Sequence, residues 1–251
     1  LEEAANAYGE NVGRAATLED LRQAAVGKFQ LGTVRLLQDR YEEALKIFVE
    51  ARDSFEALDE PSQVAKIWHQ IGTVHQEAGQ FEPAEQAYRQ SLAITVREND
   101  LAGQARTLNH LGILYDRMDR LEEAATFNRQ AAKAFRRLGD VANEGRARRN
   151  LALRLIKLRR YDEARTEIQR AIECDRPYGH AAQPWKTWST LENLERATGR
   201  AEAAQVARQR AFEAYLAYRR AGGVSHSPVA QLYALVEQAI RGGGEAQAVQ
   251  G

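Results

Sequence analysis

The sequence predicts an all-α fold, a right-handed superhelical solenoid of antiparallel helical hairpins with a capping helix at its C-terminal end. Three observations predict this fold. Similar residues recur every 40 positions, each 40-residue row holds two amphipathic stretches with helical spacing, and short turns separate these stretches. A fixed period in the range of roughly 20 to 50 residues is typical of repeat architectures, in which each repeat buries its apolar face against its neighbours.

Columns of small and large residues carry the 40-residue period. Small residues let two antiparallel helices cross closely, and large residues fill the space on either side. We therefore expect Gly72 to face the groove that Ala84 occupies. The small-residue columns are Ala44, Ala84, Ala124, Ala164 and Ala204, and Gly32, Gly72, Gly112 and Ala152, with a break at Glu192. The large-residue columns include Leu31, Ile71, Leu111, Leu151 and Leu191, and also Phe48, Tyr88 and Ile168.

Residues that favour helix ends occur at matching places in the rows. The second helix of each row opens with an acidic residue, which the positive end of the helix dipole favours. Asp100 and Asp140 precede first helices and are good N-caps. Gly79 can take the left-handed conformation that ends a helix. These signals predict two helices in each row.

The row motif is similar to that of a known family. Residues 68–72, 84–88 and 108–115 follow the pattern W-x2-L-G-x2-Y…A-x3-F closely. This pattern resembles the tetratricopeptide repeat, whose usual length is about 34 residues. The longer spacing resembles the variety found in kinesin light chains and in G-protein-regulatory adaptor proteins. The resemblance covers residues 1 to about 215 and weakens in the last row, where Glu192 replaces glycine and Arg208 replaces the aromatic residue.

We expect a single solenoid domain over residues 1–241 and a disordered tail over 242–251. The solenoid would contain the second helix of a truncated repeat at 1–18, repeats at about 21–60, 61–100, 101–140, 141–180 and 181–221, and a capping helix at about 227–241. Ser227 and Pro228 read as the start of that last helix, and Val229, Leu232, Leu235, Val236 and Ile240 form its apolar stripe. Because Leu1 falls in the middle of a motif, we expect the chain to be part of a longer protein.

Composition excludes several classes of protein. The 35 basic residues equal the 35 acidic ones, so no net charge favours nucleic acid or a membrane surface. The single cysteine, Cys174, cannot form an internal disulfide and suits a reducing cytoplasm. No apolar run approaches the roughly 20 residues of a membrane helix. We therefore expect a cytoplasmic protein that binds neither nucleic acid nor membrane.

No constellation of residues predicts catalysis, so we expect no enzyme activity, no catalytic residues, no cofactor and no metal site. His69 and His75 are six residues apart, which puts them on different faces of a helix. Cys174 and His180 have no third partner nearby. Trp68 and Trp188 hold equivalent positions and are expected to pack in the array, whereas Trp185 is less constrained and could be exposed.

The resemblance implies that the first helix of each row lines a concave groove. The register positions follow i, i+3, i+7 and i+10, which places them on one stripe of each helix. Basic residues converge there from neighbouring rows, beside apolar residues where a solvated face would be polar. A solvated, charged face remains the alternative interpretation. The candidate groove residues are Lys66, His69, Arg106, Asn109, Ile113, Arg146, Arg149, Asn150, Leu153, Ile156 and Lys186.

The sequence therefore predicts a protein–protein interaction scaffold that binds a peptide or protein segment in this groove. The expected ligand is acidic with apolar anchors, because the groove is basic with aliphatic residues between the charges. An alternative is a peptide-sensing regulatory module that controls a fused or partner effector domain. RNA binding is disfavoured by the zero net charge and by the absence of a repeating base-reading pattern.

Overall fold

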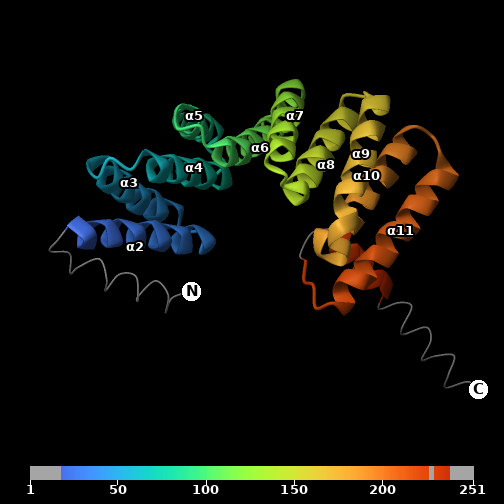
Figure 1. Cartoon of the computed structure of the whole chain (residues 1–251). Coiled ribbons are helices and arrows are strands. Elements are labelled where there is room, and N and C mark those ends of the chain that lie inside the picture. Colours follow the sequence, from blue (N-terminus) through green and yellow to red (C-terminus); the bar gives the residue numbers. More distant parts are fainter. Residues whose placement is uncertain (1–17, 226–228, 238–251) are drawn as a thin grey trace, which may run out of the picture. The chain divides into compact units, whose positions relative to one another are not determined.

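The computed structural model describes residues 18–225 and 229–237, and this part of the chain consists of helices and turns without a strand. The helices pair in chain order as antiparallel hairpins (Figure 1). The predicted all-α fold of helical hairpins is confirmed. The predicted tail at 242–251 and the predicted helix at 1–18, except for Leu18, lie outside the described residues. So do the ends of the predicted capping helix.

The chain divides into two compact units, residues 1–140 and 141–251. Over its described residues, unit 1 contains three hairpins, whose helices are α2 (Leu18–Leu37), α3 (Tyr41–Ala57), α4 (Pro61–Glu77), α5 (Phe81–Arg97), α6 (Leu101–Arg117) and α7 (Leu121–Leu138). Unit 2 contains α8 (Val141–Lys157), α9 (Tyr161–Asp175), the 3₁₀ helix η1 (Arg176–Ala182), α10 (Pro184–Ala197), α11 (Ala201–Arg220) and a helix at 229–237.

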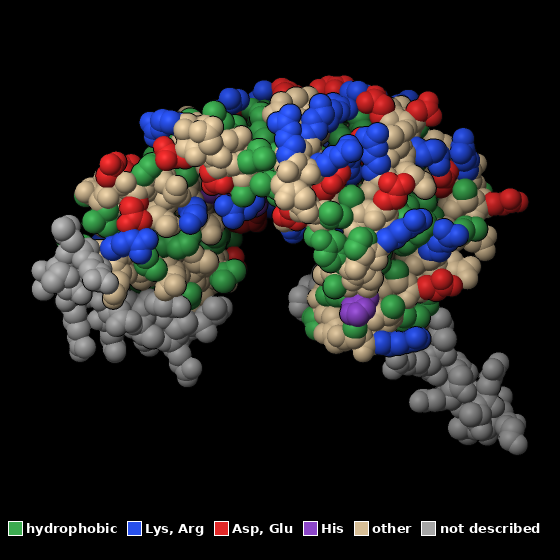
Figure 2. Space-filling model, viewed as in Figure 1, with side chains coloured by type: hydrophobic (Ala, Val, Ile, Leu, Met, Phe, Trp, Pro, Cys, Tyr) green, Lys and Arg blue, Asp and Glu red, His purple; other side chains and the backbone are tan. Residues whose placement is uncertain are grey.

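The two units carry opposite charge, which the balanced total conceals. Residues 1–140 hold 17 Lys and Arg against 23 Asp and Glu, and residues 141–251 hold 18 against 12. Unit 1 therefore has a net charge of −6 and unit 2 of +6. Basic side chains are spread over the visible face of unit 2 (Figure 2).

A left-handed residue marks the turns between helices at intervals of 20 positions. Besides Gly79, Gly139 and Gly199, the residues with positive φ at these turns are Asp39, Asp59, Asn99, Asp119 and Arg159. Asp and Asn tolerate this conformation because their short side chains bond locally to the backbone. Arginine lacks that advantage, yet Arg159 has a φ of 58°.

We expect Arg159→Gly to stabilise unit 2 by about 1 kcal/mol, because glycine takes positive φ without the steric cost that a side chain brings. Urea denaturation monitored by circular dichroism measures the gain. The control is Arg176→Gly, at a position with a φ of −53°, where glycine gives no conformational advantage. An equal or larger gain at Arg176 would contradict this explanation.

The glycine column packs against the aromatic column 16 residues later. A Cβ atom added to Gly32 would lie 2.7 Å from the Phe48 ring, and one added to Gly72 would lie 2.6 Å from the Tyr88 ring. The expectation that Gly72 faces Ala84 is therefore wrong. Ala84 is fully buried, but the ring one turn later along α5 fills the space in front of the glycine.

The last hairpin replaces this packing with an ion pair. Glu192 takes the place of the glycine and Arg208 that of the aromatic residue, and Arg208 Nε donates to Glu192 Oε1 at 2.8 Å. The Glu192 carboxylate is buried while much of Arg208 stays exposed. The two departures from the motif therefore depend on each other, because the Arg208 guanidinium neutralises the buried Glu192 carboxylate.

Asn128 occupies the aromatic position of the α6–α7 hairpin and is a local defect. Its side chain is fully buried, and neither its amide nitrogen nor its amide oxygen has a hydrogen-bond partner. Burying such an amide costs the folded protein the full desolvation free energy of the group.

We expect Asn128→Leu, which is similar in shape, to raise the free energy of unfolding of unit 1 by about 1–3 kcal/mol. Chemical denaturation would show it, and a loss of stability would mean that an unseen partner satisfies the amide.

Trp185 lies in the core of unit 2, so the expectation that it could be exposed is wrong. Its side chain is 1% exposed. The Tyr215 and Tyr233 rings contact it edge-on, with centroids at 5.8 and 6.4 Å. Tyr233 and the buried Ala230 come from the helix at 229–237, which covers the indole.

The predicted apolar stripe of that helix is also wrong for most of its residues. Leu232 and Leu235 are 58% and 64% exposed, while Ala230 and Tyr233 are buried. The helix buries the face that carries Ala230 and Tyr233, and not the face that carries Leu232 and Leu235, because the Tyr233 ring packs on Trp185 and Tyr215. Val229, at the start of the helix, is half-buried and packs on this cluster.

Candidate functional site

Unit 1 has a pocket of about 500 Å³ on the side where the first helices of its hairpins lie. Three of the predicted groove residues, Lys66, His69 and Arg106, line it. Asn109 and Ile113 are half-buried on α6 but do not belong to its lining. The remaining lining residues are Phe29, Ala65, Gln70, Thr73, Ser91, Thr95, Asp100, Gly103, Thr107 and His110.

Two imidazoles meet in this pocket, and the sequence predicted only one of them. The His69 and His110 rings lie edge-on with centroids 4.5 Å apart, and His69 Nδ1 is 3.2 Å from Thr107 Oγ1. Burial, and then the neighbouring His110 and Arg106, lower the pKa of His69 to about 3. The register could have revealed His110, because it stands in one column with the pocket residue Gln70.

This depressed pKa predicts a pH-dependent loss of stability. The folded state keeps His69 neutral down to about 3, whereas an unfolded histidine takes up its proton near 6.5. The unfolded state therefore binds more protons between these values, and stability falls as the pH falls through that window. We expect His69→Gln to reduce the slope of unfolding free energy against pH between pH 6.5 and pH 4. An unchanged slope would show that His69 protonates in the folded protein.

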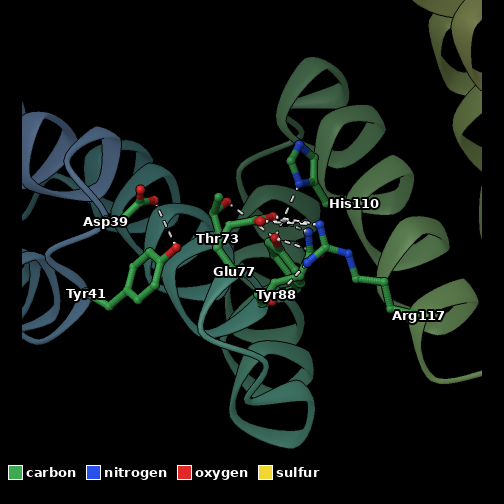
Figure 3. Close-up of polar contacts among 8 residues, drawn as sticks. Asp39, Tyr41, Thr73, Glu77, Tyr88, His110 and Arg117 are labelled. Carbon is green, nitrogen blue, oxygen red and sulfur yellow. Dashed lines mark hydrogen bonds and ion pairs between the residues drawn. The ribbon is translucent and has the colours of Figure 1, made fainter. Parts of the chain in front are cut away.

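Tyr88 connects the helices behind the pocket (Figure 3). Its hydroxyl oxygen lies 3.3 Å from each of Thr73 Oγ1, Gln76 Oε1 and His110 Nδ1. The Thr73 hydroxyl already donates to the His69 carbonyl. The Tyr88 hydroxyl has one proton, which it donates to an oxygen of Thr73 or Gln76 on α4. His110 Nδ1 therefore donates to the Tyr88 hydroxyl oxygen. Burial raises the pKa of Tyr88, so the phenol stays neutral.

The same network includes an ion pair between α4 and α6. Arg117 donates to the Glu77 carboxylate at 3.1 Å and to the Gln76 carbonyl at 3.1 Å (Figure 3). Tyr41 donates to Asp39 at 3.0 Å nearby. These contacts fix the first helices of successive hairpins, so the pocket has a defined shape before any ligand binds.

In unit 2 the predicted residues gather three cations on α8 and α10. The pKa of Lys186 is lowered by burial and then by Arg149 and Arg146. Burial also lowers the pKa of Arg149, where attraction by Asp175 is partly offset by repulsion from Arg146. Arg146 itself is exposed and donates to Asn143. The arrangement attracts an anion.

A pocket of about 240 Å³ lies beside these cations. Of the predicted groove residues, Arg149, Leu153 and Lys186 line it, together with Trp185, Ser189, Thr190, Asn193 and Val229. Asn150 and Ile156 are half-buried on α8 and do not line it. The sequence missed Trp185 and Val229 as parts of this pocket, because the path of the chain after α11 has no counterpart in the earlier rows.

Trp68 and Trp188 line two further pockets in equivalent register positions. The pocket at Trp68 measures about 540 Å³ and the one at Trp188 about 380 Å³. An arginine covers each indole, with Arg52 at 4.9 Å from the Trp68 ring and Arg210 at 4.8 Å from the Trp188 ring. These cation–π contacts hold both rings against the helices.

The described residues hold neither a metal-ligand cluster nor a membrane-spanning helix. Within that part of the chain, no three His, Cys, Asp or Glu side chains come together as metal ligands would. None of its helices combines the length and the apolar character needed to span a bilayer. Cys174 is buried, and burial raises the pKa of its thiol to about 11.

Solved structures with a similar fold have low sequence identity to the chain. BtubC from P. vanneervenii has a TM-score of 0.77 at 18% identity, with 90% of this chain and 94% of that one covered. A signal transduction ATPase with numerous domains and a tetratricopeptide repeat sensor, from Pyrococcus horikoshii, has a TM-score of 0.70 at 16% identity, covering 81% of this chain and 31% of its own. Aspartyl phosphate phosphatase F from Bacillus subtilis has a TM-score of 0.69 at 15% identity, and the match covers 81% of this chain and 54% of the phosphatase.

Sequence comparison gives the family. No curated protein matches the chain in sequence. The tetratricopeptide repeat model, however, matches residues 20–97, 63–137 and 103–177. These overlapping matches span residues 20–177, and a kinesin light chain-like repeat protein from Podospora anserina shares the fold with a TM-score of 0.67. The predicted resemblance is confirmed, and the chain belongs to the tetratricopeptide repeat family.

Proposed function

We propose that the chain is a non-catalytic protein-interaction module that binds a segment of another protein along the first helices of its hairpins. The observation that carries this proposal is the group of cations formed by Arg146, Arg149 and Lys186 in unit 2. Burial and repulsion by neighbouring cations disfavour the charges of Arg149 and Lys186, and an anionic ligand would offset these costs. Arginine is suited to a carboxylate because its planar guanidinium can form two parallel hydrogen bonds.

The proposed ligand is an acidic segment with apolar anchors. The net charge of +6 on unit 2 steers such a segment toward the cations. Leu153, in the pocket, and the half-buried Ile156 on the same helix offer apolar contact beside the charges. Each square ångström of apolar surface buried contributes about 25 cal/mol before the costs of association.

The pocket of unit 1 offers a different kind of contact to a bound chain. Hydroxyl, amide and imidazole groups line it, including Gln70, Thr73 and His110. Such groups can bond to the peptide backbone of a ligand and so accept several sequences. In this proposal a segment bound at unit 1 is held by its main chain, and a segment bound at unit 2 is selected by its acidic and apolar side chains.

A regulatory module is the second candidate. Similar folds occur in a signal transduction ATPase with a tetratricopeptide repeat sensor, of which this chain covers 31%, and in an aspartyl phosphate phosphatase. In such a role, peptide binding would change the activity of an attached or partner domain. A change in affinity for the peptide when the effector is present would support regulation, since coupling between two sites is reciprocal.

Selection from a random peptide library displayed on phage tests the proposed function. We expect the immobilised chain to enrich peptides rich in Asp and Glu with interspersed Leu, Ile or Phe, and calorimetry on synthetic copies to give one-to-one binding. Affinity should fall with added salt, because salt screens the contacts to Arg146, Arg149 and Lys186. Enrichment of basic peptides, or of none, would overturn the proposal.

A further inference from the structure

We propose that the pocket between α8, α10 and the helix at 229–237 is an anchor site for one large apolar side chain of a bound segment, whose neighbouring Asp or Glu side chain is held by Arg149 and Lys186. This inference rests on the proposed function and specifies the ligand at one place. It adds two lining residues that the candidate groove did not include, Val229 and Trp185, whose side chain is 1% exposed.

The size and lining of the pocket fit one side chain. Its volume of about 240 Å³ corresponds to roughly eight water molecules at about 30 Å³ each. That space is large enough for a leucine or phenylalanine side chain. Leu153 and Val229 supply apolar surface, while Ser189 and Asn193 add polar groups to the lining.

The charge at the pocket selects an acidic neighbour. Lys186 Nζ lies 5.3 Å from the centroid of the Trp185 ring, and Arg149 lines the same pocket from α8. Among the described residues neither cation forms an ion pair within 4.0 Å. The nearby Asp175 attracts Arg149, but its carboxylate accepts a hydrogen bond from Thr187 at 2.7 Å. A ligand carboxylate would therefore meet two cations without breaking an ion pair.

The helix at 229–237 belongs to this site as well as to the core. Its Ala230 and Tyr233 pack on the aromatic cluster of Trp185 and Tyr215, which holds Val229 at the pocket. The same helix turns Leu232 and Leu235 outward. Val229 can thus be changed to test the pocket, with Leu232 as a matched control on the same helix.

Small capped peptides test the chemistry directly. The indole N–H of Trp185 gives one of three tryptophan signals in an NMR spectrum of the full chain, and Trp185→Phe identifies it. We expect acetyl-Glu-Leu-amide to shift this signal saturably at millimolar concentration. Acetyl-Gln-Leu-amide and acetyl-Glu-Ala-amide should bind about tenfold more weakly, because each lacks one of the two required groups.

Three outcomes of the peptide titrations would overturn the proposal. Equal binding of acetyl-Gln-Leu-amide would show that the site does not require a carboxylate. A change confined to the indole signal of Trp68 or Trp188 would place the binding site elsewhere. Tighter binding of acetyl-Ala-Leu with a free C-terminal carboxylate would replace the acidic side chain with a chain end. Each outcome comes from the same titration series, once Trp185→Phe has assigned the Trp185 signal.

Variants then separate the anchor from the wider function. We expect Lys186→Gln to weaken acetyl-Glu-Leu-amide about tenfold and Val229→Phe to abolish its binding by filling the pocket, with Leu232→Phe unchanged. Circular dichroism checks that each variant folds. A contrary result would be that library-selected peptides bind the Lys186→Gln and Val229→Phe variants with the same affinity as the parent chain. That result would overturn the proposed anchor site and leave the proposed function standing. A library that gives no binder would overturn the function itself.

Discussion

We expect the double substitution Arg146→Glu with Arg149→Glu to reduce binding of library-selected acidic peptides by more than about 100-fold while leaving helicity intact. Two charge-assisted contacts are lost, each contributing about 1.5–3 kcal/mol, and two repulsive charges replace them. The new carboxylates would also pair with Lys186, which removes the third cation from the ligand. Calorimetry measures the affinity, and far-ultraviolet circular dichroism checks the fold.

The control for this prediction changes the same charge elsewhere in unit 2. Arg219→Glu with Arg220→Glu alters two exposed arginines at the end of α11 and shifts the net charge equally. If binding depended only on the overall field of unit 2, both double variants would weaken it alike. Unchanged affinity in the Arg146 and Arg149 variant would show that the groove assignment is wrong, and the acidic unit 1 would become the better candidate.

The second large effect concerns stability. We expect Trp185→Ala to lower the free energy of unfolding of unit 2 by about 3–5 kcal/mol, the usual range for a large aromatic residue truncated in a core. The indole is 1% exposed and contacts Tyr215 and Tyr233. Its loss also frees the helix at 229–237 from its main packing partner. Urea denaturation monitored by circular dichroism would show a lower midpoint.

Trp188→Ala is the matched control for this loss. Trp188 lies on the same helix, is half-buried and is covered on one side by Arg210. Because less of its surface leaves water on folding, its truncation should cost less than that of Trp185. Equal losses for the two variants would mean that the helix at 229–237 does not shield Trp185 in solution.

The hairpin fold could be predicted from the sequence because its determinants repeat. Five alanines at intervals of 40 residues are all buried, at 0–4% exposure, so each row gives independent evidence for the same helix crossing. The sequence predicts the turns less completely, because glycine is the residue expected to end a helix in the left-handed conformation. Asp59, Asn99 and Asp119 adopt it too.

Where the repeat ends, sequence pattern was a poor guide. The helix at 229–237 has two possible apolar faces, and the choice between them depends on the Trp185 and Tyr215 rings that it meets. No earlier row contains such a partner. The division into two units also left no trace in the 40-residue period, because Asp140 precedes its helix as Asp100 does.

The candidate site was partly predictable for a related reason. Register places Lys66, His69, Arg149 and Lys186 on the first helices of their hairpins, and each of them lines a pocket. Register does not say how deep a pocket is or which side chains lie behind it. The contact between His69 and His110 depends on the spacing of α4 and α6, which only packing fixes.

The ion pair of Glu192 and Arg208 limits how hairpins of this protein can be exchanged or duplicated. A helix like α10 joined to a partner like α5 would press a carboxylate against a tyrosine ring, and a helix like α4 joined to α11 would leave the arginine opposite glycine. An unpaired buried carboxylate is strongly destabilising. The hairpin, inherited whole, is therefore the smallest piece that could be moved between positions, and chimeras cut at the turn inside a hairpin should fold less well than chimeras cut between hairpins.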